Sequence, residues 1–211
     1  MISIIGLVSL IGMLVVSVVL HELAHGWVAF RMGDSTAQQL GRLTLHPIAH
    51  IDWLGSIVLP ALCALLGSPV WIAWAKPVPV NSRNLKNPEN DMMWIAIAGP
   101  LTNITLAVVV GILFRIFLNT GSIVSGEIAY QLMIQFVFLN LGLAVFNLIP
   151  IPPLDGSKIL MPFLSGRSRY WFSVIAPYGI GIILCISFTG VLSRLVTGII
   201  MPIGQGLLYG I

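Results

Sequence analysis

Two histidines one helical turn apart give the first indication of chemistry. They belong to His21-Glu22-Leu23-Ala24-His25, an HExxH pattern. On a helix, residues at i and i+4 share one face, so both imidazoles can reach a single tetrahedral Zn²⁺. Glu22 stands beside them and could take a proton from a water that the metal has acidified. The pattern predicts one hydrolytic zinc ion per chain, with His21 and His25 as ligands and Glu22 as the base.

A catalytic zinc ion takes three protein ligands, so two histidines leave one position to fill. Among the seven acidic residues, Asp155 stands out by its setting in NLIPIPPLDG, residues 147–156. The prolines free the backbone from helical geometry and Gly156 permits a tight turn, so this carboxylate could point back towards the histidines. The alternative is that Asp155 is a turn or capping residue of a helix opening at Ser157. We expect Asp155 to be the third ligand, with Asp52 as the next candidate.

The composition places these residues in a membrane protein. Of 211 residues, 57% are hydrophobic and 8% are charged, and the mean hydropathy is +1.00. Soluble domains usually carry about a quarter charged residues, so a water-soluble globule is excluded. The net charge of +3 comes from Lys and Arg side chains that are too few and too scattered for nucleic-acid binding. An ionisable cluster inside such a chain is costly in lipid and therefore indicates a functional site.

Long apolar segments must position the reactive residues. A spanning helix needs roughly 20 apolar residues, and the sequence predicts an all-α, polytopic protein with about four to six membrane segments. The expected helices, the last range holding two of them, cover residues 2–30, 92–118, 128–149 and 170–211. We treat 1–211 as a single integral-membrane domain, with a catalytic core over roughly 1–164 and C-terminal helices over 170–211.

Two further segments are irregular. Residues 53–74 are interrupted by Pro60 and Pro69, and the short intact part suits a re-entrant segment better than a complete span. Residues 41–45 alternate polar and apolar side chains and could form one strand of a short hairpin at the membrane edge. Such a strand would offer main-chain groups to an extended substrate segment.

Charge counting favours the re-entrant layout, because cytoplasmic loops collect Lys and Arg. If residues 53–74 span the membrane, the ten Lys and Arg side chains divide six to four, and if they re-enter, the division is eight to two. The second layout has the stronger bias, and it makes the helices at 2–30 and 128–149 run in the same direction. It predicts a multi-pass cell-membrane protein whose reactive residues lie towards the cytoplasmic side.

Three motifs together resemble the site-2 protease family of intramembrane zinc metalloproteases. They are HELAHG at residues 21–26, Gly99-Pro100-Leu101-Thr102-Asn103, and NLIPIPPLDG. The resemblance implies a core of three helices, those at 2–30, 92–118 and 128–149, that holds Zn²⁺ through the two histidines and the aspartate, with the glutamate as base. It also implies peptide-bond hydrolysis in or near transmembrane segments of membrane-protein substrates, within the lipid bilayer. No soluble block is long enough for the PDZ-like or CBS-like domain of larger members, so the chain resembles a short form.

Other polar residues carry weaker signals. Asn140 and Asn147 lie seven residues apart, hence roughly on one helical face, and they resemble asparagines that the family places near the substrate or the oxyanion. Hydrogen bonding between helices is the alternative for both, and it is our interpretation of Asn103. His46 and His50 repeat the i, i+4 spacing, but a proline follows His46 where a base would stand. We interpret these two as surface or interfacial histidines.

Two other classes of function compete with proteolysis. Intramembrane His and Asp also line ion pathways, so a metal transporter or a non-proteolytic metal-binding membrane protein is the main alternative. Glu22 discriminates between them, because a transporter could tolerate Gln there whereas a protease would keep zinc and lose turnover. An inactive scaffold is disfavoured by the presence of the whole ligand and base set.

Overall fold

The computed structural model describes residues 4–58 and 75–210, and within these ranges the chain is helical, with no strand. Five of the described helices are long and apolar enough to cross a membrane. These candidate spans are Val8–Arg31, Pro88–Asn119, Ile128–Asn147, Gly166–Phe188 and Val191–Tyr209. The prediction of an all-α protein with about four to six membrane segments is therefore confirmed.

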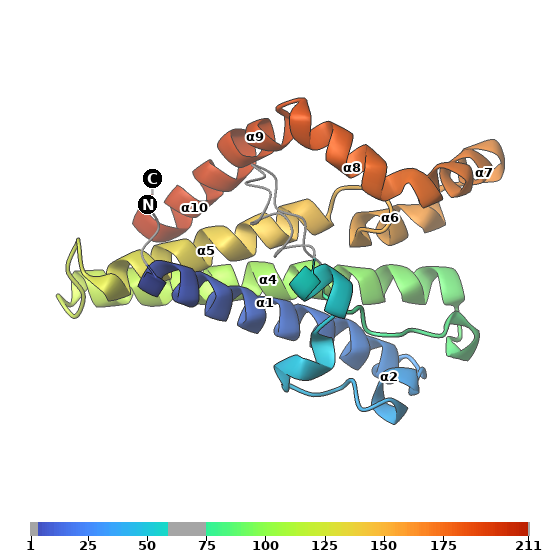
Figure 1. The fold of residues 1–211 in the computed structure, drawn as a ribbon, viewed down its shortest axis with the longest axis horizontal. Helices are drawn as coiled ribbons and strands as arrows, with labels where there is room; N and C mark the ends of the chain where they lie inside the picture. The colour runs from blue at the N-terminus through green and yellow to red at the C-terminus, as the bar shows by residue number, and fades with distance from the viewer. Residues whose placement is uncertain (1–3, 59–74, 211) are drawn as a thin grey trace.

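Three of the spans form a bundle. They are α1 (Ile4–Arg31), α4 (Pro88–Asn119) and α5 (Ile128–Asn147). Proline suits the first turn of α4, where no N–H is needed for the helix. Figure 1 shows α1 and α5 running in the same direction, with α4 running against both. The predicted parallel arrangement of the first and the last of these helices is observed, and their C-terminal ends point towards the same end of the bundle (Figure 1).

An apolar cluster closes the bundle on the side of α4 and α5. Its buried members are Ala107, Phe114, Ile123, Val137, Leu141, Ile200 and Leu208. Small residues allow the close approach, since a Cβ at Gly111 would lie 3.2 Å from that of Leu207. Large apolar side chains also point outwards, and Ile112 and Val16 are each about half exposed. This outer surface suits a lipid environment, where exposed aliphatic groups carry no hydrophobic cost.

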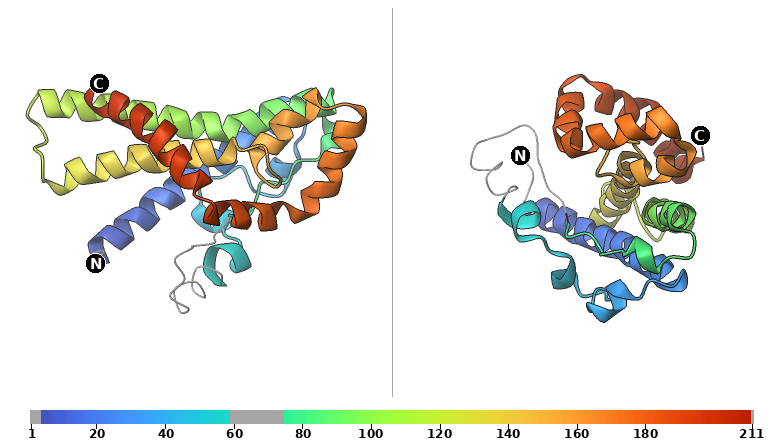
Figure 2. Two further views of the ribbon diagram at one scale, coloured as in Figure 1. Left: turned by 90° about the horizontal axis from the view of Figure 1, so that it is seen from above. Right: turned by 90° about the vertical axis from the view of Figure 1, so that its right-hand side faces the viewer.

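The C-terminal part contains the two further spans expected beyond residue 170. The first joins α7 (Gly166–Ile175) to α8 (Gly179–Phe188), and the second joins α9 (Val191–Leu195) to α10 (Met201–Tyr209). Gly190, with φ of +76°, separates them. The two spans form an arch over α5, and α10 returns along α4 and α5 (Figures 1 and 2).

The polar stretch after α1 consists of short helical turns. They are α2 (Thr36–Gln39), η1 (Pro47–His50), η2 (Trp53–Val58) and, after the interruption, η3 (Ser82–Asn84). The prediction of a hairpin strand at residues 41–45 is wrong, because this segment forms turns and bends. Gly41 takes φ of +66°, and the N–H of Arg42 donates to the carbonyl of Ala37. These groups close the end of α2 and leave the segment without a partner strand among the described residues.

The predicted re-entrant segment, residues 53–74, lies largely outside the described residues. Its first part, Trp53–Val58, forms the π-helical turn η2. The described chain on either side of the gap meets directly, because the N–H of Lys76 donates to the carbonyl of His50 at 2.9 Å. The backbone before η2 and the backbone after the interruption therefore lie side by side at His50 and Lys76.

Candidate metal centre

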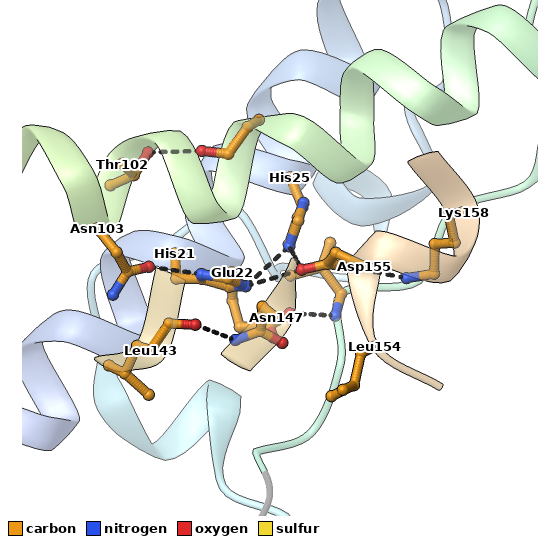
Figure 3. Close-up of polar contacts among 12 residues, drawn as sticks. His21, Glu22, His25, Thr102, Asn103, Leu143, Asn147, Leu154, Asp155 and Lys158 are labelled. Atoms are coloured by element: carbon orange, nitrogen blue, oxygen red, sulfur yellow. Dashed lines mark hydrogen bonds and ion pairs between the residues drawn. The ribbon is translucent and has the colours of Figure 1, made fainter. Parts of the chain in front are cut away.

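Two imidazoles and one carboxylate converge where α1, α4 and the start of α6 (Asp155–Leu160) meet (Figure 3). Asp155 Oδ2 lies 3.1 Å from His21 Nε2 and 3.1 Å from His25 Nε2, and the two nitrogens are 3.0 Å apart. All three residues are buried. Within the described part of the chain, no other trio of His, Cys, Asp or Glu converges in this way.

The donor set fits a zinc ion. Two neutral imidazoles and one carboxylate are a ligand set of catalytic zinc sites, which leave the fourth position open. A tetrahedral ion with bonds of about 2.0–2.1 Å spaces its ligands roughly 3.3 Å apart, close to the observed 3.0–3.1 Å. Small outward shifts of the three atoms would complete the geometry.

Gly99 on α4 provides the room for this convergence. A Cβ at this position would lie 2.4 Å from His25 Nε2 and 2.5 Å from His21 Nε2. No side chain larger than hydrogen fits there without displacing an imidazole. The glycine of the Gly99-Pro100 pair therefore leaves the space that the two imidazoles occupy.

Each histidine is oriented through its second ring nitrogen. His25 Nδ1 lies 2.6 Å from the carbonyl oxygen of Ile95, which can only accept, so this nitrogen carries the proton. A carbonyl oxygen has two lone pairs, so a place in α4 does not prevent that of Ile95 from accepting from His25 as well. His25 Nε2 is left unprotonated and free to bind a metal ion.

A series of hydrogen bonds between buried polar groups orients His21 through its Nδ1. His21 Nδ1 lies 2.6 Å from Asn103 Oδ1, Asn103 Nδ2 donates to Asn140 Oδ1 at 3.0 Å, and Asn140 Nδ2 donates to Ser17 Oγ at 3.0 Å. This series of hydrogen bonds links α1, α4 and α5, and its members Ser17, Asn103 and Asn140 have no exposed surface. We call it the amide relay.

Backbone carbonyls determine where the protons of the amide relay lie. Asn140 Nδ2 also donates to the carbonyl of Phe136, and Ser17 Oγ donates to that of Met13. These carbonyls only accept, so Asn140 must present its oxygen to Asn103, and Asn103 must present its own oxygen to His21. His21 Nδ1 therefore carries the proton, and Nε2 is the free metal-binding nitrogen.

Asp155 reaches the site from the proline-rich end of α5. Helix α6 begins at Asp155 itself, two residues before the start considered in the sequence, and a Cβ on Gly156 would lie 2.2 Å from the carbonyl oxygen of Leu148. Lys158 Nζ lies 3.2 Å from Asp155 Oδ1, and this positive charge favours the ionised form of the carboxylate. The carboxylate is ionised, as a metal ligand must be.

Glu22 lies next to this trio, but its carboxylate forms a hydrogen bond with a different part of the chain. Its Oε2 accepts a hydrogen bond of 2.8 Å from the backbone N–H of Val78, which lies in the extended chain before η3. No other hydrogen bond to its carboxylate occurs among the described residues. Glu22 thus takes no part in the triangle formed by the three donor atoms.

Comparison with known proteins identifies the group to which this site belongs. The model of peptidase family M50 matches residues 9–133 and 115–188, which together make up most of the chain. The chain belongs to peptidase family M50. It is an intramembrane zinc metalloprotease, as the resemblance to the site-2 proteases predicts.

Similar proteins occur in bacteria and archaea. YwhC of Bacillus subtilis (strain 168) is 37% identical over 83% of this chain and 78% of its own length. Rip2 of Mycolicibacterium smegmatis is 30% identical over 84% of this chain and 66% of its own length, and both are described as candidate zinc metalloproteases. The zinc metalloprotease MJ0392 of Methanocaldococcus jannaschii is 29% identical over 86% of this chain, which spans 42% of that protein. No solved structure matches this chain.

Some of the residues with weaker sequence signals contribute to the M50 site, and others lie outside it. Asn140 joins the amide relay, whereas Asn147 is partly exposed and donates to the carbonyl of Leu143 at 3.0 Å. His46 is exposed as expected, but His50 is buried, with Nε2 bonded to the carbonyl of Thr44. Asp52 lies directly before η2 and accepts from the N–H of Gly55. His46, His50 and Asp52 do not belong to the metal-binding trio.

Several contributors to the M50 site gave no usable signal in the sequence. Ile95 and Val78 act through a backbone carbonyl and a backbone N–H, which do not depend on the type of side chain. Ser17 lies one turn before His21, and this i, i+4 spacing is the one pattern that could have suggested it. Helical spacing cannot reveal its contact with Asn140, because that contact depends on how α1 packs against α5.

Proposed function

We propose that His21, His25 and Asp155 hold one zinc ion and that Glu22 is the general base of peptide-bond hydrolysis. The observation that carries this proposal is the convergence of three unprotonated donor atoms, two of them fixed as metal-binding nitrogens by hydrogen bonds on the far side of each ring. When bound, zinc polarises a carbonyl group and makes a water molecule more acidic.

The remaining chemistry belongs to Glu22. Its carboxylate takes a proton from the attacking water and passes that proton to the amine that leaves. The hydrogen bonds from His21 Nδ1 to Asn103 and from His25 Nδ1 to Ile95 fix the tautomer in which each Nε2 is free to bind a metal ion. A substrate helix must unwind locally before its peptide bond is accessible, so helix-breaking residues in the substrate should promote cleavage.

The two asparagines receive different roles in this proposal. Asn140 has both amide hydrogens and its oxygen engaged inside the bundle, so it positions His21 and does not reach the substrate. Asn147 is partly exposed and uses one amide hydrogen on its own helix, which leaves the second for a substrate carbonyl or the oxyanion. This division replaces the shared role that their spacing suggests.

The substrates that suit such a site are membrane proteins cleaved in or near a transmembrane segment. His25 lies six residues before the end of α1, and Gly99 lies eleven residues after the start of α4, so the site is inside the half of the bundle nearer these two ends. The meeting of His50 with Lys76 at this end supports the eight-to-two division of basic residues, and with it a cytoplasmic active site. Single-domain organisation over residues 1–211 and the single zinc ion per chain are parts of the same proposal.

A cleavage assay on purified protein tests the assignment. Wild-type enzyme and Glu22→Gln are incubated with single-span membrane substrates, with and without a chelator, and zinc is measured on the same preparations. We expect chelation to abolish cleavage and added zinc to restore it. Glu22→Gln should keep its zinc and lose about 10²–10⁴ in rate. Near-normal cleavage by Glu22→Gln would refute the role of this residue as the base.

A further inference from the structure

The segment that contacts Glu22 is a short extended stretch, Lys76–Pro79, which we call the strap. In Figure 3 the extended trace that leads towards η3 passes beside Glu22. The sequence at its centre is Pro77-Val78-Pro79. Proline has no backbone N–H, so Val78 supplies the one N–H between Lys76 and Val80. That N–H is the group that donates to Glu22 Oε2 at 2.8 Å.

One end of the strap is held by a buried cation. Arg42 is 7% exposed, and its Nη2 donates to the carbonyl of Lys76 at 2.8 Å and to that of Pro77 at 3.4 Å. The N–H of Lys76 donates in turn to the carbonyl of His50. Because both polar groups of the Lys76 backbone are bonded, the chain is fixed two residues before Val78.

The chain is fixed again just beyond the strap. The N–H of Asn81 donates to Asp34 Oδ2 at 2.7 Å, and Asp34 has no exposed surface. The other oxygen of this carboxylate accepts from Thr36 N and from Asn84 Nδ2. Asp34 therefore ties the chain after the strap to the turn that follows α1.

Glycine on α1 lets the strap lie against the helix. A Cβ at Gly26, one turn beyond Glu22, would lie 3.0 Å from Val78 Cγ1 and 2.6 Å from Leu43 Cδ2. Val78 is 8% exposed, so its side chain is buried against this part of α1. The strap is thus held at both ends and packed against α1, while the N–H of Val78 is directed at the carboxylate.

We propose that the strap is a positioning element for the catalytic base, acting through the N–H of Val78. This inference rests on the assignment of Glu22 as the base. A hydrogen bond to an ionised group is stronger than one between neutral groups, and it occupies one carboxylate oxygen. Oε1 remains available for the proton of the attacking water. A base held in this way spends less entropy in reaching its reactive geometry, so the strap should raise kcat and leave KM unchanged.

The sharpest test removes this N–H alone. Incorporation of α-hydroxyisovaleric acid at position 78 replaces the N–H by an ester oxygen and keeps the valine side chain. The same replacement at Val80 is a matched control, because it creates the same proline–valine ester, and the Val80 N–H has no hydrogen-bond partner among the described residues. Both proteins are measured for zinc per folded protein, kcat and KM, alongside Glu22→Gln.

We expect the ester at position 78 to lower kcat about 10- to 100-fold with unchanged KM and zinc content, while the ester at position 80 behaves as wild type. Equal effects at both positions, a change in KM alone, or zinc loss in proportion to activity would each overturn the inference. If Glu22→Gln cleaves normally, the base assignment fails and this inference fails with it. If Glu22→Gln is inactive and the position-78 ester is fully active, the inference about the strap alone fails.

A conventional substitution provides a second route should the ester protein not fold. Arg42→Met keeps an unbranched apolar stem in the buried space and removes the bonds to the carbonyls of Lys76 and Pro77. A freer strap should lower kcat in the same direction, by less than the ester, with KM and zinc content unchanged. Wild-type kcat in folded Arg42→Met would contradict the proposal.

Discussion

The metal-ligand side of the site is held by helices, whereas the Glu22 side is held by irregular chain. His21 and His25 lie on α1 and are oriented by groups on α4 and α5, through side chains without exposed surface. Glu22 also lies on α1, but its carboxylate is fixed by an extended segment 56 residues away in the sequence. One turn of helix thus presents ligands to a rigid bundle and the base to a loop.

This difference separates two requirements of the enzyme. Metal ligands must hold one geometry throughout the reaction, and packed helices with fully paired polar groups provide that rigidity. A base must move a proton between partners, and a single backbone donor leaves its second oxygen free. We expect mutations on the helix side to alter zinc binding, and mutations on the loop side to alter turnover while zinc remains.

The largest effect should follow removal of the third ligand. Asp155→Ala leaves two imidazoles, which hold zinc poorly, so zinc content and cleavage should both fall to near background. Elemental analysis of the purified protein measures the first quantity. Asp52→Ala is the matched control, because Asp52 lies directly before a helical turn and takes no part in the trio. Full zinc occupancy in Asp155→Ala would transfer the ligand role to another acid.

Filling the space at Gly99 should come next. The added methyl group of Gly99→Ala would overlap both Nε2 atoms, so we expect zinc affinity and cleavage to fall at least about 10-fold. Gly142→Ala adds the same methyl group on α5, where a Cβ meets nothing within 4 Å, and should remain close to wild type. Zinc titration of both proteins makes the comparison, and equal affinities would show that the imidazoles can move aside.

Breaking the amide relay should weaken zinc binding through His21 alone. Asn140→Ala leaves Asn103 without its partner and His21 free to adopt the other tautomer, so zinc affinity should fall about 10- to 100-fold. Asn147→Ala removes an amide outside the relay and should leave zinc affinity unchanged while lowering cleavage. If instead Asn140→Ala binds zinc normally and Asn147→Ala does not, the roles assigned to the two asparagines are reversed.

The smallest effect should appear at the loop side, in the stability of Asp34→Asn. Burial alone would raise the pKa of Asp34, but hydrogen bonds from Thr36, Asn84 and Asn81 outweigh it and hold this pKa below its usual value. The carboxylate therefore stabilises the fold above the pKa of the unfolded chain, about 3.9, and this contribution is lost as the pH falls through the lower folded value. We expect Asp34→Asn to be less stable by about 1–3 kcal/mol at neutral pH.

The difference between the wild type and Asp34→Asn should shrink at acidic pH. Thermal unfolding of zinc-free samples in detergent at pH 7 and pH 3.5 measures it, since the metal site then makes no contribution. A difference that stays constant between the two pH values would show that the charge of Asp34 has no part in the stability of this region.

Several residues show which features of this structure can be predicted from sequence patterns. The spacing of His21 and His25 predicts their convergence, because residues four apart on a helix share a face. The proline-rich motif predicts Asp155, since its prolines end α5 and turn the chain back. Charge bias predicts the parallel course of α1 and α5. The alternation in residues 41–45 misleads, because a strand needs a partner and this segment uses its polar groups in local turns.

Side-chain chemistry and helical spacing, both written in the sequence, determine that this protein carries an HExxH motif on an apolar helix, and they predict the aspartate of the candidate metal site. Only the tertiary structure decides that Asn140 serves His21, that Gly99 leaves room for two imidazoles, and that Val78 donates to Glu22. The physical reason is that these contacts join segments far apart in the chain. The N–H of Val78 also has no side-chain identity by which a sequence pattern could mark it, so its role depends on where packing places the strap.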